Sequence, residues 1–600
     1  MQSVSLKQIK VTDGFLKTRL TANRNNTVYN VYDRFKETGR FDALKCVKEE
    51  TKSHIFWDSD VAKWIEGACY MLYANEDKNL RALMDQVIDD MVNNQLENGY
   101  FNSYFQVYEP DAIFTRRNDH ELYCAGHIFE AAVALKDYLN DDRLLNFASK
   151  YVDYIIDRFT VKKDTGFVTP GHQEIELALL RLYKLTNEEK YLNLAKFFID
   201  NRGANDKEEC SFYNQSHLPV RHQTTAVGHA VRALYLYTAM ADMALTIKDV
   251  ELENAVKTLF DDIVKSKLYV TGGTGSSYNG EKFGIDYNLN NLGAYNETCA
   301  AIALCYFADK LMQLYGDAKY GDIIEKVIYN AFMSGVSIDG NSYFYVNPLE
   351  VKKDRVEYES TLPNWAKDKH PLLKRVKVFD CSCCPPNVVR FTEEIPSYAV
   401  YYDEDLSTIT VSQYLSEEVY TPLASVNIDS NFPYDGKVKI SVNSYGKDIK
   451  LKLRKPSWCK VNFYNEENGY LVFEGVFDDA EIELDFKMSF YEIYANPTVL
   501  EDFGKVCFNY GPLVLCAEGT DNDFNILSVK IPKKAKIKGE VLYGDPYVVN
   551  ANLKVLYYPK TEKLYDVKPP KKIEKTLKLI PYFAWANRDE NDMAVWFTKC

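Results

Sequence analysis

The feature that most restricts the fold is a helical unit that recurs along the first half of the chain. Three units begin with Gly-His, and each continues into a long stretch with apolar residues at helical spacing: Gly126-His127, Gly171-His172 and Gly228-His229. A polar turn and a second helix follow within units of about 45 to 60 residues. Because one helical hairpin cannot bury its own apolar stripe, such units favour an α/α toroid.

The repeat also predicts where its histidines lie. If the first helices line the ring in parallel, each Gly-His stands at a helix start, and His127, His172 and His229 converge on one end of the central cavity. Helix N-termini direct their partial positive charge to that end. A lone histidine is more often an ordinary core or surface residue, but three of eight histidines in register modestly favour a functional cavity.

The second half of the chain has the periodicity of strands. Helical spacing prevails from about residue 58 to about 317, and from about residue 399 apolar residues alternate or run together between Gly, Asn, Asp and Pro. Stretches 409–414, 438–442, 482–486 and 506–516 are typical of β-sandwich strands. We therefore predict a multidomain chain that is helical first and β-rich later.

Charge and apolar content restrict the partners and the compartment. The net charge is −14 without any Lys/Arg-rich run, which argues against nucleic acid and anionic membranes as partners. An uncharged small molecule or glycan fits better. No stretch approaches the roughly 18 apolar residues of a membrane helix, and the N-terminus lacks a signal-like apolar run. We expect a cytoplasmic protein with reduced thiols.

A metal site is predicted from the fourth helical unit and a cysteine cluster. In place of Gly-His, the fourth unit has Asn296-Glu297-Thr298-Cys299, and Cys381, Cys383 and Cys384 precede Pro385-Pro386. Three thiols and a carboxylate suit Zn²⁺ or another ion that accepts soft ligands. The candidate ligands are Glu297, Cys299, Cys383 and Cys384. A vicinal disulfide and a purely structural zinc site are the alternatives.

The spacing of these ligands restricts their backbone. Glu297 and Cys299 are two residues apart and would point in nearly opposite directions on a regular helix, so both can bind one ion only if the first turn is unwound. Pro385 disfavours helical dihedrals at Cys384, and we expect an extended turn there. Cys381 and the other cysteines have no partner pattern and are interpreted as buried or inert thiols.

With these motifs the chain resembles the β-L-arabinofuranosidases of glycoside hydrolase family 127. The resemblance runs from Asp58-Ser59-Asp60-Val61-Ala62-Lys63-Trp64 through the Gly-His units to Cys383-Cys384-Pro385-Pro386-Asn387. It implies an (α/α)6 barrel followed by β-sandwich domains, and a zinc ion held by Glu297, Cys299, Cys383 and Cys384. It also implies a retaining enzyme with Cys383 as nucleophile and Glu281, from Gly280-Glu281-Lys282-Phe283-Gly284, as acid/base.

The resemblance further implies a set of sugar contacts. By this likeness His127, His172, His229, Glu325 and Tyr345 would contact sugar hydroxyls, and Asn30 stands where the family has a sugar-binding glutamine. From the residues alone, two structural alternatives are as plausible as sugar contact: Glu325 on a helix surface and Tyr345 in the core of a strand. The loop 271–296 is glycine-rich but lacks the Gly-Lys-Ser/Thr ending of a phosphate-binding loop, and we interpret it as the mobile rim that carries Glu281.

The implied roles of Cys383 and Glu281 match the two groups that a retaining glycosidase needs. A retaining glycosidase needs a nucleophile on one side of the anomeric carbon and a proton donor near the leaving oxygen. Zinc binding and a helix N-terminus would hold a thiol of ordinary pKa of about 8.5 as thiolate. A sugar epimerase that uses the three histidines, and a glycan-binding protein whose zinc only connects the domains, are the two other hypotheses.

These expectations divide the chain into four segments. We predict an N-terminal strand segment at 1–20 that joins a β-sandwich, the barrel at 21–398, a β-sandwich at 399–500 and a second β-domain at 501–600. The last domain could pair with a second copy of the chain. The predicted substrate is an oligosaccharide that carries terminal β-L-arabinofuranose or a related furanoside.

Overall fold

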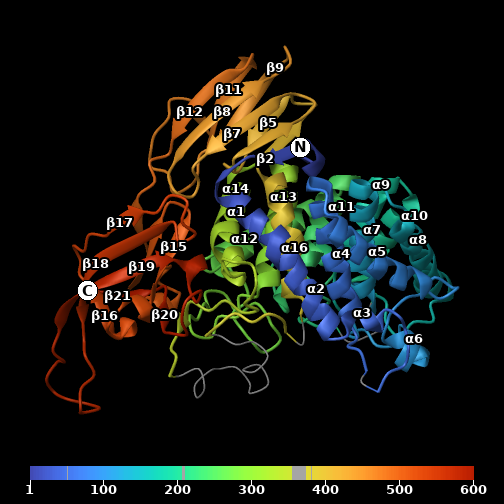
Figure 1. Cartoon of the computed structure of the whole chain (residues 1–600), viewed down its shortest axis with the longest axis horizontal. Helices are drawn as coiled ribbons and strands as arrows, with labels where there is room; N and C mark the ends of the chain where they lie inside the picture. The colour runs from blue at the N-terminus through green and yellow to red at the C-terminus, as the bar shows by residue number, and fades with distance from the viewer. Residues whose placement is uncertain (51, 206–209, 355–372, 380–381) are drawn as a thin grey trace.

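The computed structural model describes residues 1–50, 52–205, 210–354, 373–379 and 382–600. Helices occupy the chain up to Glu394, and strands dominate from Val400 onward. Figure 1 shows the helices gathered on one side, with one group of strands above them and another, red in the figure, beside them. The predicted order of a helical part followed by a β-rich part is confirmed.

Six of the described helices pack in cyclic order. Each contacts the next along the chain, and the last contacts the first, which closes a ring. In order these inner helices are α4 (Trp57–Ala74), α7 (Glu121–Leu139), α9 (Ile175–Thr186), α11 (Ala230–Ile247), α13 (Thr298–Tyr315) and α16 (Cys384–Glu394). Of these helices, α4, α7, α11 and α13 are buried on nearly every side. This explains why α7, α11 and α13 are apolar around most of their circumference.

A second set of helices covers the ring from outside. In α8 the buried residues are Leu144, Phe147, Ala148, Tyr151, Val152 and Ile155, a single stripe at helical spacing. The outer helices are α2 (Val28–Glu37), α5 (Lys78–Asn93), α8 (Arg143–Ile156), α10 (Glu189–Asn201), α12 (Val250–Ser266) and α14 (Ala318–Lys326). Each packs on an inner helix. Short helices complete this part: α1 (Gly14–Ala22), α3 (Arg40–Ala43) and α6 (Phe105–Tyr108).

The glycines of the Gly-His repeat permit close helix approach. A Cβ atom at Gly126 would lie 2.7 Å from Cγ of Glu174 and 2.8 Å from the backbone nitrogen of Ile175, at the start of α9. Real Cβ contacts are not this short, so α7 and α9 can approach only because residue 126 is glycine. Gly228 has a φ of +72°, which glycine adopts without strain.

Two sheets above the ring include strands from both ends of the sequence. One has the order β1-β4-β5-β9-β11-β10, and the other β12-β8-β7-β6-β2. Their bounds are β1 (Gln2–Ser3), β2 (Ile9–Val11), β4 (Val400–Asp403), β5 (Thr408–Val411), β6 (Glu417–Tyr420), β7 (Ser425–Ser430), β8 (Lys437–Asn443), β9 (Asp448–Arg454), β10 (Glu466–Glu467), β11 (Tyr470–Val476) and β12 (Ala480–Asp485). Residues in β9 of the first sheet and β8 of the second alternate between buried and more exposed, so each sheet buries one face.

A third sheet contains the C-terminal strands. Its order is β13-β14-β21-β16-β18-β19-β15-β20-β3, and β17 pairs with β18. The bounds are β3 (Glu350–Val351), β13 (Phe490–Ile493), β14 (Lys505–Tyr510), β15 (Leu513–Glu518), β16 (Val529–Ile531), β17 (Lys538–Val541), β18 (Val549–Tyr557), β19 (Ile573–Pro581), β20 (Met593–Ala594) and β21 (Phe597–Lys599). The stretch 506–516, predicted as one run, is a hairpin that turns at Gly511. Among the described residues, no helix is both long and apolar enough to cross a bilayer.

Candidate active site

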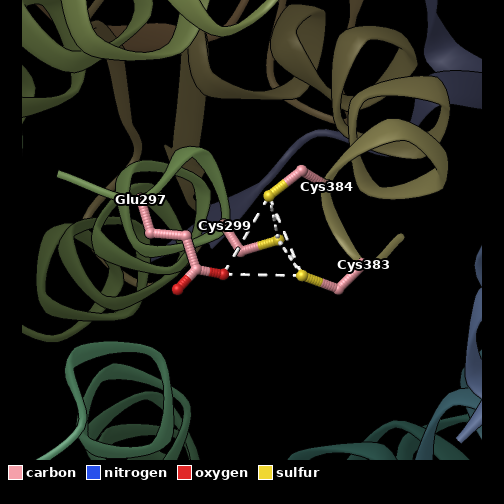
Figure 2. Close-up of side chains that lie close together, drawn as sticks. All are labelled: Glu297, Cys299, Cys383 and Cys384. Atoms are coloured by element: carbon pink, nitrogen blue, oxygen red, sulfur yellow. Dashed lines mark hydrogen bonds between the residues drawn. The ribbon is translucent and has the colours of Figure 1, made fainter. Parts of the chain in front are cut away.

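Four side chains from two chain segments meet at one end of the ring (Figure 2). The Cys299 sulfur lies 3.5 Å from that of Cys383 and 3.4 Å from that of Cys384. An oxygen of Glu297 lies 3.5 Å from the Cys383 sulfur and 4.0 Å from the Cys384 sulfur. The structure therefore brings together all four predicted metal ligands, each of them buried.

The start of α13 places Glu297 and Cys299 on the same side. Glu297 is the residue before the helix and is extended, with φ of −61° and ψ of 138°. It pairs with Val346, and the backbone nitrogen of Thr298 donates to the carbonyl of Tyr345 at 3.0 Å. The predicted unwinding at this point is confirmed, and strand-like pairing is its cause.

The backbone at Cys383 and Cys384 is helical, so the predicted extended turn at Cys384 is wrong. Helix α16 begins at Cys384, and Cys383 also has helical dihedrals, with φ of −62° and ψ of −33°. Proline is tolerated in a first helical turn because its missing N–H would have no partner there. Helix geometry therefore presents the two neighbouring thiols. Cys381 lies outside the described residues.

The thiols are not bonded to one another. The sulfurs of Cys383 and Cys384 are 3.8 Å apart, whereas a disulfide bond is about 2.05 Å long. Burial alone would raise the pKa of Cys299, but contact with the thiols of Cys383 and Cys384 lowers it to about 6. Burial, followed by contact with the other thiols, raises the pKa of Cys384. Three buried sulfurs and one carboxylate oxygen fit a thiophilic divalent cation, which would let all three thiols ionise.

Glu281 lies beside this cluster on an anchored loop. Its carboxylate is 2.8 Å from Nε2 of His229, and one atom each of His229, Glu281 and Glu297 lies within 4.8 Å of the others. The backbone nitrogen of Ala230 donates to the Glu281 carbonyl at 2.9 Å, and that of Phe283 to the Gly228 carbonyl at 3.0 Å. Glu281 has a φ of +50°, a conformation that non-glycine residues rarely adopt.

The three repeated histidines converge, although only His229 stands at a helix start. His229 is the residue before α11, His172 precedes α9 by three residues, and His127 lies inside α7, whose first residue is Glu121. The rings of His172 and His229 are 5.5 Å apart. The Tyr123 ring lies 4.6 Å from that of His127 and 4.2 Å from that of His172.

Burial keeps these histidines neutral. It lowers the pKa of His127 and of His172 well below the usual range, and it also lowers that of His229 although the carboxylate of Glu281 opposes the shift. Nδ1 of His127 lies 3.0 Å from Glu174 and 3.4 Å from Glu130. Neutral imidazoles can both donate and accept hydrogen bonds, as contact with sugar hydroxyls requires.

The other predicted sugar contacts have different outcomes. The Tyr345 hydroxyl lies 3.2 Å from the Cys383 sulfur and so belongs to the site. Glu325 is not brought to it, because Arg454 and Trp458 of the β-rich part each donate to its carboxylate at 2.7 Å. Asn30 lies on α2, and its buried amide oxygen has no hydrogen-bond partner among the described residues.

Several aromatic residues of the site were not predicted from the sequence. Tyr123 stands between two of the histidines, and the Tyr235 ring lies 6.2 Å from both His127 and His172. His120, next to α7, has its ring 5.7 Å from that of His172. With 45 tyrosines in the chain, composition could not single out Tyr123 and Tyr235, and only the helical spacing of Tyr123 from His127 offered a signal.

Comparison with known proteins shows which family the chain is similar to. Residues 8–397 match the family described as "Beta-L-arabinofuranosidase, GH127 catalytic domain", and residues 491–598 match its C-terminal domain. A non-reducing end β-L-arabinofuranosidase from Bifidobacterium longum subsp. longum is 32% identical, over 91% of this chain and 90% of the relative.

Solved structures agree over the whole chain. A GH127 β-L-arabinofuranosidase from Geobacillus stearothermophilus T6 is 34% identical, with a TM-score of 0.92 over 99% of this chain and 100% of that one. A second GH127 β-arabinofuranosidase is 32% identical, with a TM-score of 0.90 over 100% and 98%. A chain that matches both domains at this level is a glycoside hydrolase, an enzyme that acts on oligosaccharides. It belongs to glycoside hydrolase family 127.

Proposed function

We propose that this protein is a retaining exo-glycosidase that releases terminal β-L-arabinofuranose or a related furanoside. The proposal rests on the meeting of the Cys383 thiol, the Glu297 carboxylate and the His229–Glu281 pair at one end of the ring. The sugar is taken from the relatives, since two of them are described as β-L-arabinofuranosidases.

In this proposal, Glu297, Cys299, Cys383 and Cys384 hold Zn²⁺. The donor set supports the assignment, because thiolate and carboxylate are usual zinc ligands and all four side chains are buried within reach of one another. Bound zinc would stabilise the ionised form of the thiols at neutral pH.

The first step forms a bond between sugar and sulfur. The Cys383 sulfur attacks the anomeric carbon while the bond from that carbon to the leaving oxygen breaks. Glu281 gives its proton to the leaving oxygen, and the aglycone departs as an alcohol. His229 holds the Glu281 carboxyl in position through their 2.8 Å contact.

The second step releases the sugar with its original anomeric configuration. Glu281, now ionised, takes a proton from water as the water oxygen bonds to the anomeric carbon, and the carbon–sulfur bond breaks. Cys383 returns to its thiolate form. His127, His172, His229 and Tyr345 are the proposed contacts to the sugar hydroxyls, and Asn30 remains a predicted contact. Glu325 is left out, because Arg454 and Trp458 bind its carboxylate.

The proposed architecture is an (α/α)6 barrel at 21–398, a β-sandwich at 399–500 joined by the segment 1–20, and a second β-domain at 501–600. The cyclic packing of six inner helices and the outer helix on each support the barrel. Pairing of β1 with β4 and of β2 with β6 supports the assignment of the N-terminal segment. Pairing of two copies and a cytoplasmic location remain predictions.

Replacement of Cys383 by serine tests the nucleophile. We expect Cys383→Ser to lose hydrolysis of nitrophenyl β-L-arabinofuranoside by at least about a hundredfold while the protein remains folded, because a neutral hydroxyl is a far weaker nucleophile than a thiolate. Cys210→Ser, at an exposed thiol, should keep full activity. Full activity in Cys383→Ser would refute the proposal. Unfolding of Cys383→Ser together with loss of zinc would instead favour a structural metal.

Replacement of Glu281 by glutamine tests the acid/base. With an alkyl arabinoside, whose leaving oxygen needs a proton, we expect Glu281→Gln to lower kcat/KM by about 10²- to 10⁴-fold. With a nitrophenyl glycoside, whose leaving group departs without a proton, formation of the sugar–sulfur intermediate should be much less affected. Burst kinetics and mass spectrometry of the trapped intermediate measure this. Equal losses with both leaving groups would contradict the assigned role.

A further inference from the structure

A cavity of about 570 Å³ lies at the end of the ring opposite the thiol cluster. Residues from all six inner helices line it, among them Tyr70, Asp137, Arg181, Asp242, Lys310 and Glu394, and the N-terminal segment from Ser3 to Leu6 forms part of its wall. Cys299 and Cys384 stand at the start of α13 and α16, whereas the cavity-lining residues of these helices lie toward their ends. The cavity is therefore separate from the proposed active site.

The basic side chains in the cavity are already paired. Eight charged side chains line it, of which five are acidic and three are basic. Arg181 donates to Glu66 at 2.7 Å and to Glu130 at 2.5 Å, and Lys184 and Lys310 both form ion pairs with Asp242. Asp137 pairs with Lys7, which does not line the cavity, and one negative charge in the cavity therefore remains without an ion pair among the described residues.

Glu394 carries that charge. The hydroxyls of Tyr306, at 2.7 Å, and Tyr70, at 3.3 Å, donate to its two carboxylate oxygens. No basic side chain among the described residues forms an ion pair with Glu394. Burial, followed by the carboxylate of Glu66, raises the pKa of Glu394 to about 7, although Arg390 and Arg181, which bind Glu66 and Glu130, oppose the shift. The ionised form of a partly buried carboxylate that makes no ion pair is unfavourable, and either a proton or a bound cation can compensate its charge.

The surroundings of Glu394 favour a cation. The inner helices direct their C-terminal ends, which carry partial negative charge, toward this end of the ring. Tyr70, Tyr138, Tyr306 and Tyr398 line the cavity, and the faces of aromatic rings attract ammonium groups. A neutral sugar would leave Glu394 without a counter-charge, whereas an ammonium group would supply it.

We propose that this cavity is a second binding site, which takes a small organic cation with a primary ammonium group paired to Glu394. The tyrosine hydroxyls keep the carboxylate oriented, and the rings flank the alkyl chain of the ligand. The site does not depend on the glycosidase mechanism, because none of the residues proposed to act in that mechanism lines the cavity.

Titration calorimetry with the full-length protein tests the proposal, with putrescine as probe and the uncharged 1,4-butanediol as its matched control. We expect putrescine to bind with one site per chain and the diol not to bind. Glu394→Gln keeps the shape of the side chain and should weaken putrescine binding about tenfold or more, because it removes the charge that faces the ligand. Glu393→Gln, at the neighbouring glutamate, which pairs with Arg24 outside the cavity, should leave the affinity unchanged.

Three results would overturn the proposal: binding of the diol as tight as that of putrescine, unchanged putrescine affinity in Glu394→Gln, or no binding of putrescine at all. Should Glu394→Gln fail to fold, Tyr306→Phe replaces it, because it removes the hydroxyl that orients Glu394 and keeps the ring. Weaker putrescine binding in Tyr306→Phe supports the site, and unchanged binding refutes it. Unaltered arabinofuranosidase activity in these variants would show that ligand binding in the cavity and glycoside hydrolysis at the thiol cluster are independent.

Discussion

Glu297 illustrates how one backbone conformation decides the site. Its extended dihedrals, just before α13, turn its carboxylate toward the Cys299 sulfur although only one residue separates them in the sequence. In a regular helix the two side chains would diverge by about 200°. The strand-like pairing with Val346 supplies the hydrogen bond that helical geometry would otherwise provide.

Glu121, at the first position of α7, should make stability depend on pH. Burial raises the pKa of its carboxyl to about 8, from an ordinary value near 4.5, although Tyr100 and Phe114 donate hydrogen bonds to it. The folded protein therefore holds this proton more tightly than the unfolded chain. The resulting contribution is fully present below about pH 4.5 and is lost as the pH rises to about 8, by up to about 1.4 kcal/mol per pH unit.

Glu121→Gln should remove this dependence. Urea unfolding should show parallel pH dependence of the unfolding free energy for variant and wild type below about pH 4.5 and above about pH 8. Between pH 5 and 8 the variant should gain stability relative to wild type. Glu97→Gln, at an exposed glutamate, is the control and should run parallel to wild type. A constant difference between Glu121→Gln and wild type from pH 5 to 8 would contradict the assignment.

At the scale of elements, a buried ion-pair group holds α16 in the ring. Arg390, two turns after Cys383, donates to Glu66 of α4 at 2.7 Å and to Glu130 of α7 at 2.5 Å. Arg181 of α9 binds the other oxygens of the same two glutamates. Two arginines and two glutamates thus join four inner helices, one of which begins with a proposed metal ligand and another of which contains His127.

Arg390→Met should be strongly destabilising. Removal of one member leaves Glu66 and Glu130 buried with less compensating charge, which typically costs about 3 to 5 kcal/mol of unfolding free energy. Arg116→Met is the control, because Arg116 is 48% exposed and its pairs with Glu109 and Asp119 should be worth less than about 1 kcal/mol each. Equal losses of unfolding free energy for Arg390→Met and Arg116→Met in chemical denaturation would show that the buried ion pairs stabilise the fold no more than exposed ones.

At the scale of the whole molecule, the helical and β-rich parts share hydrogen bonds and a sheet. Strand β3, which precedes α16 in sequence, pairs with β20 near the C-terminus. Asn330 donates to the carbonyl of Pro512 at 3.0 Å and accepts from the backbone nitrogen of Val514 at 2.8 Å. Asn291, on the segment between Glu281 and the metal ligands, donates to Asp502 at 2.6 Å. The C-terminal sheet therefore supports the loops of the active site.

Truncation at residue 490 should destabilise the helical part that remains. Calorimetry of the intact chain is expected to show that the helical part and the C-terminal sheet unfold in one transition, because the two share buried contacts. The truncated chain should unfold at a lower temperature and lose activity. An unchanged transition temperature for the helical part after truncation would show that the shared strand and hydrogen bonds contribute little.

Local patterns carried much of the prediction. The change from helical to strand periodicity near residue 399, the Gly-His units and the soft-ligand set of Glu297, Cys299, Cys383 and Cys384 all follow from residue type and spacing. Local patterns did not predict which side chains reach the site when contacts between distant parts of the chain determine their positions. Glu325 has a helical position compatible with a site, but Arg454, 129 residues later, binds its carboxylate instead.

The sequence by itself determined that the chain is helical first and β-rich later and which residues could hold a metal, because these depend on periodicity and on the chemistry of single side chains. Only the tertiary structure decided that His127 lies inside its helix, that α16 begins at the thiols and that Arg390 pairs with Glu66 and Glu130. The physical reason is that ring closure brings residues from opposite ends of the chain together, and the cost of burying their charges selects the pairs.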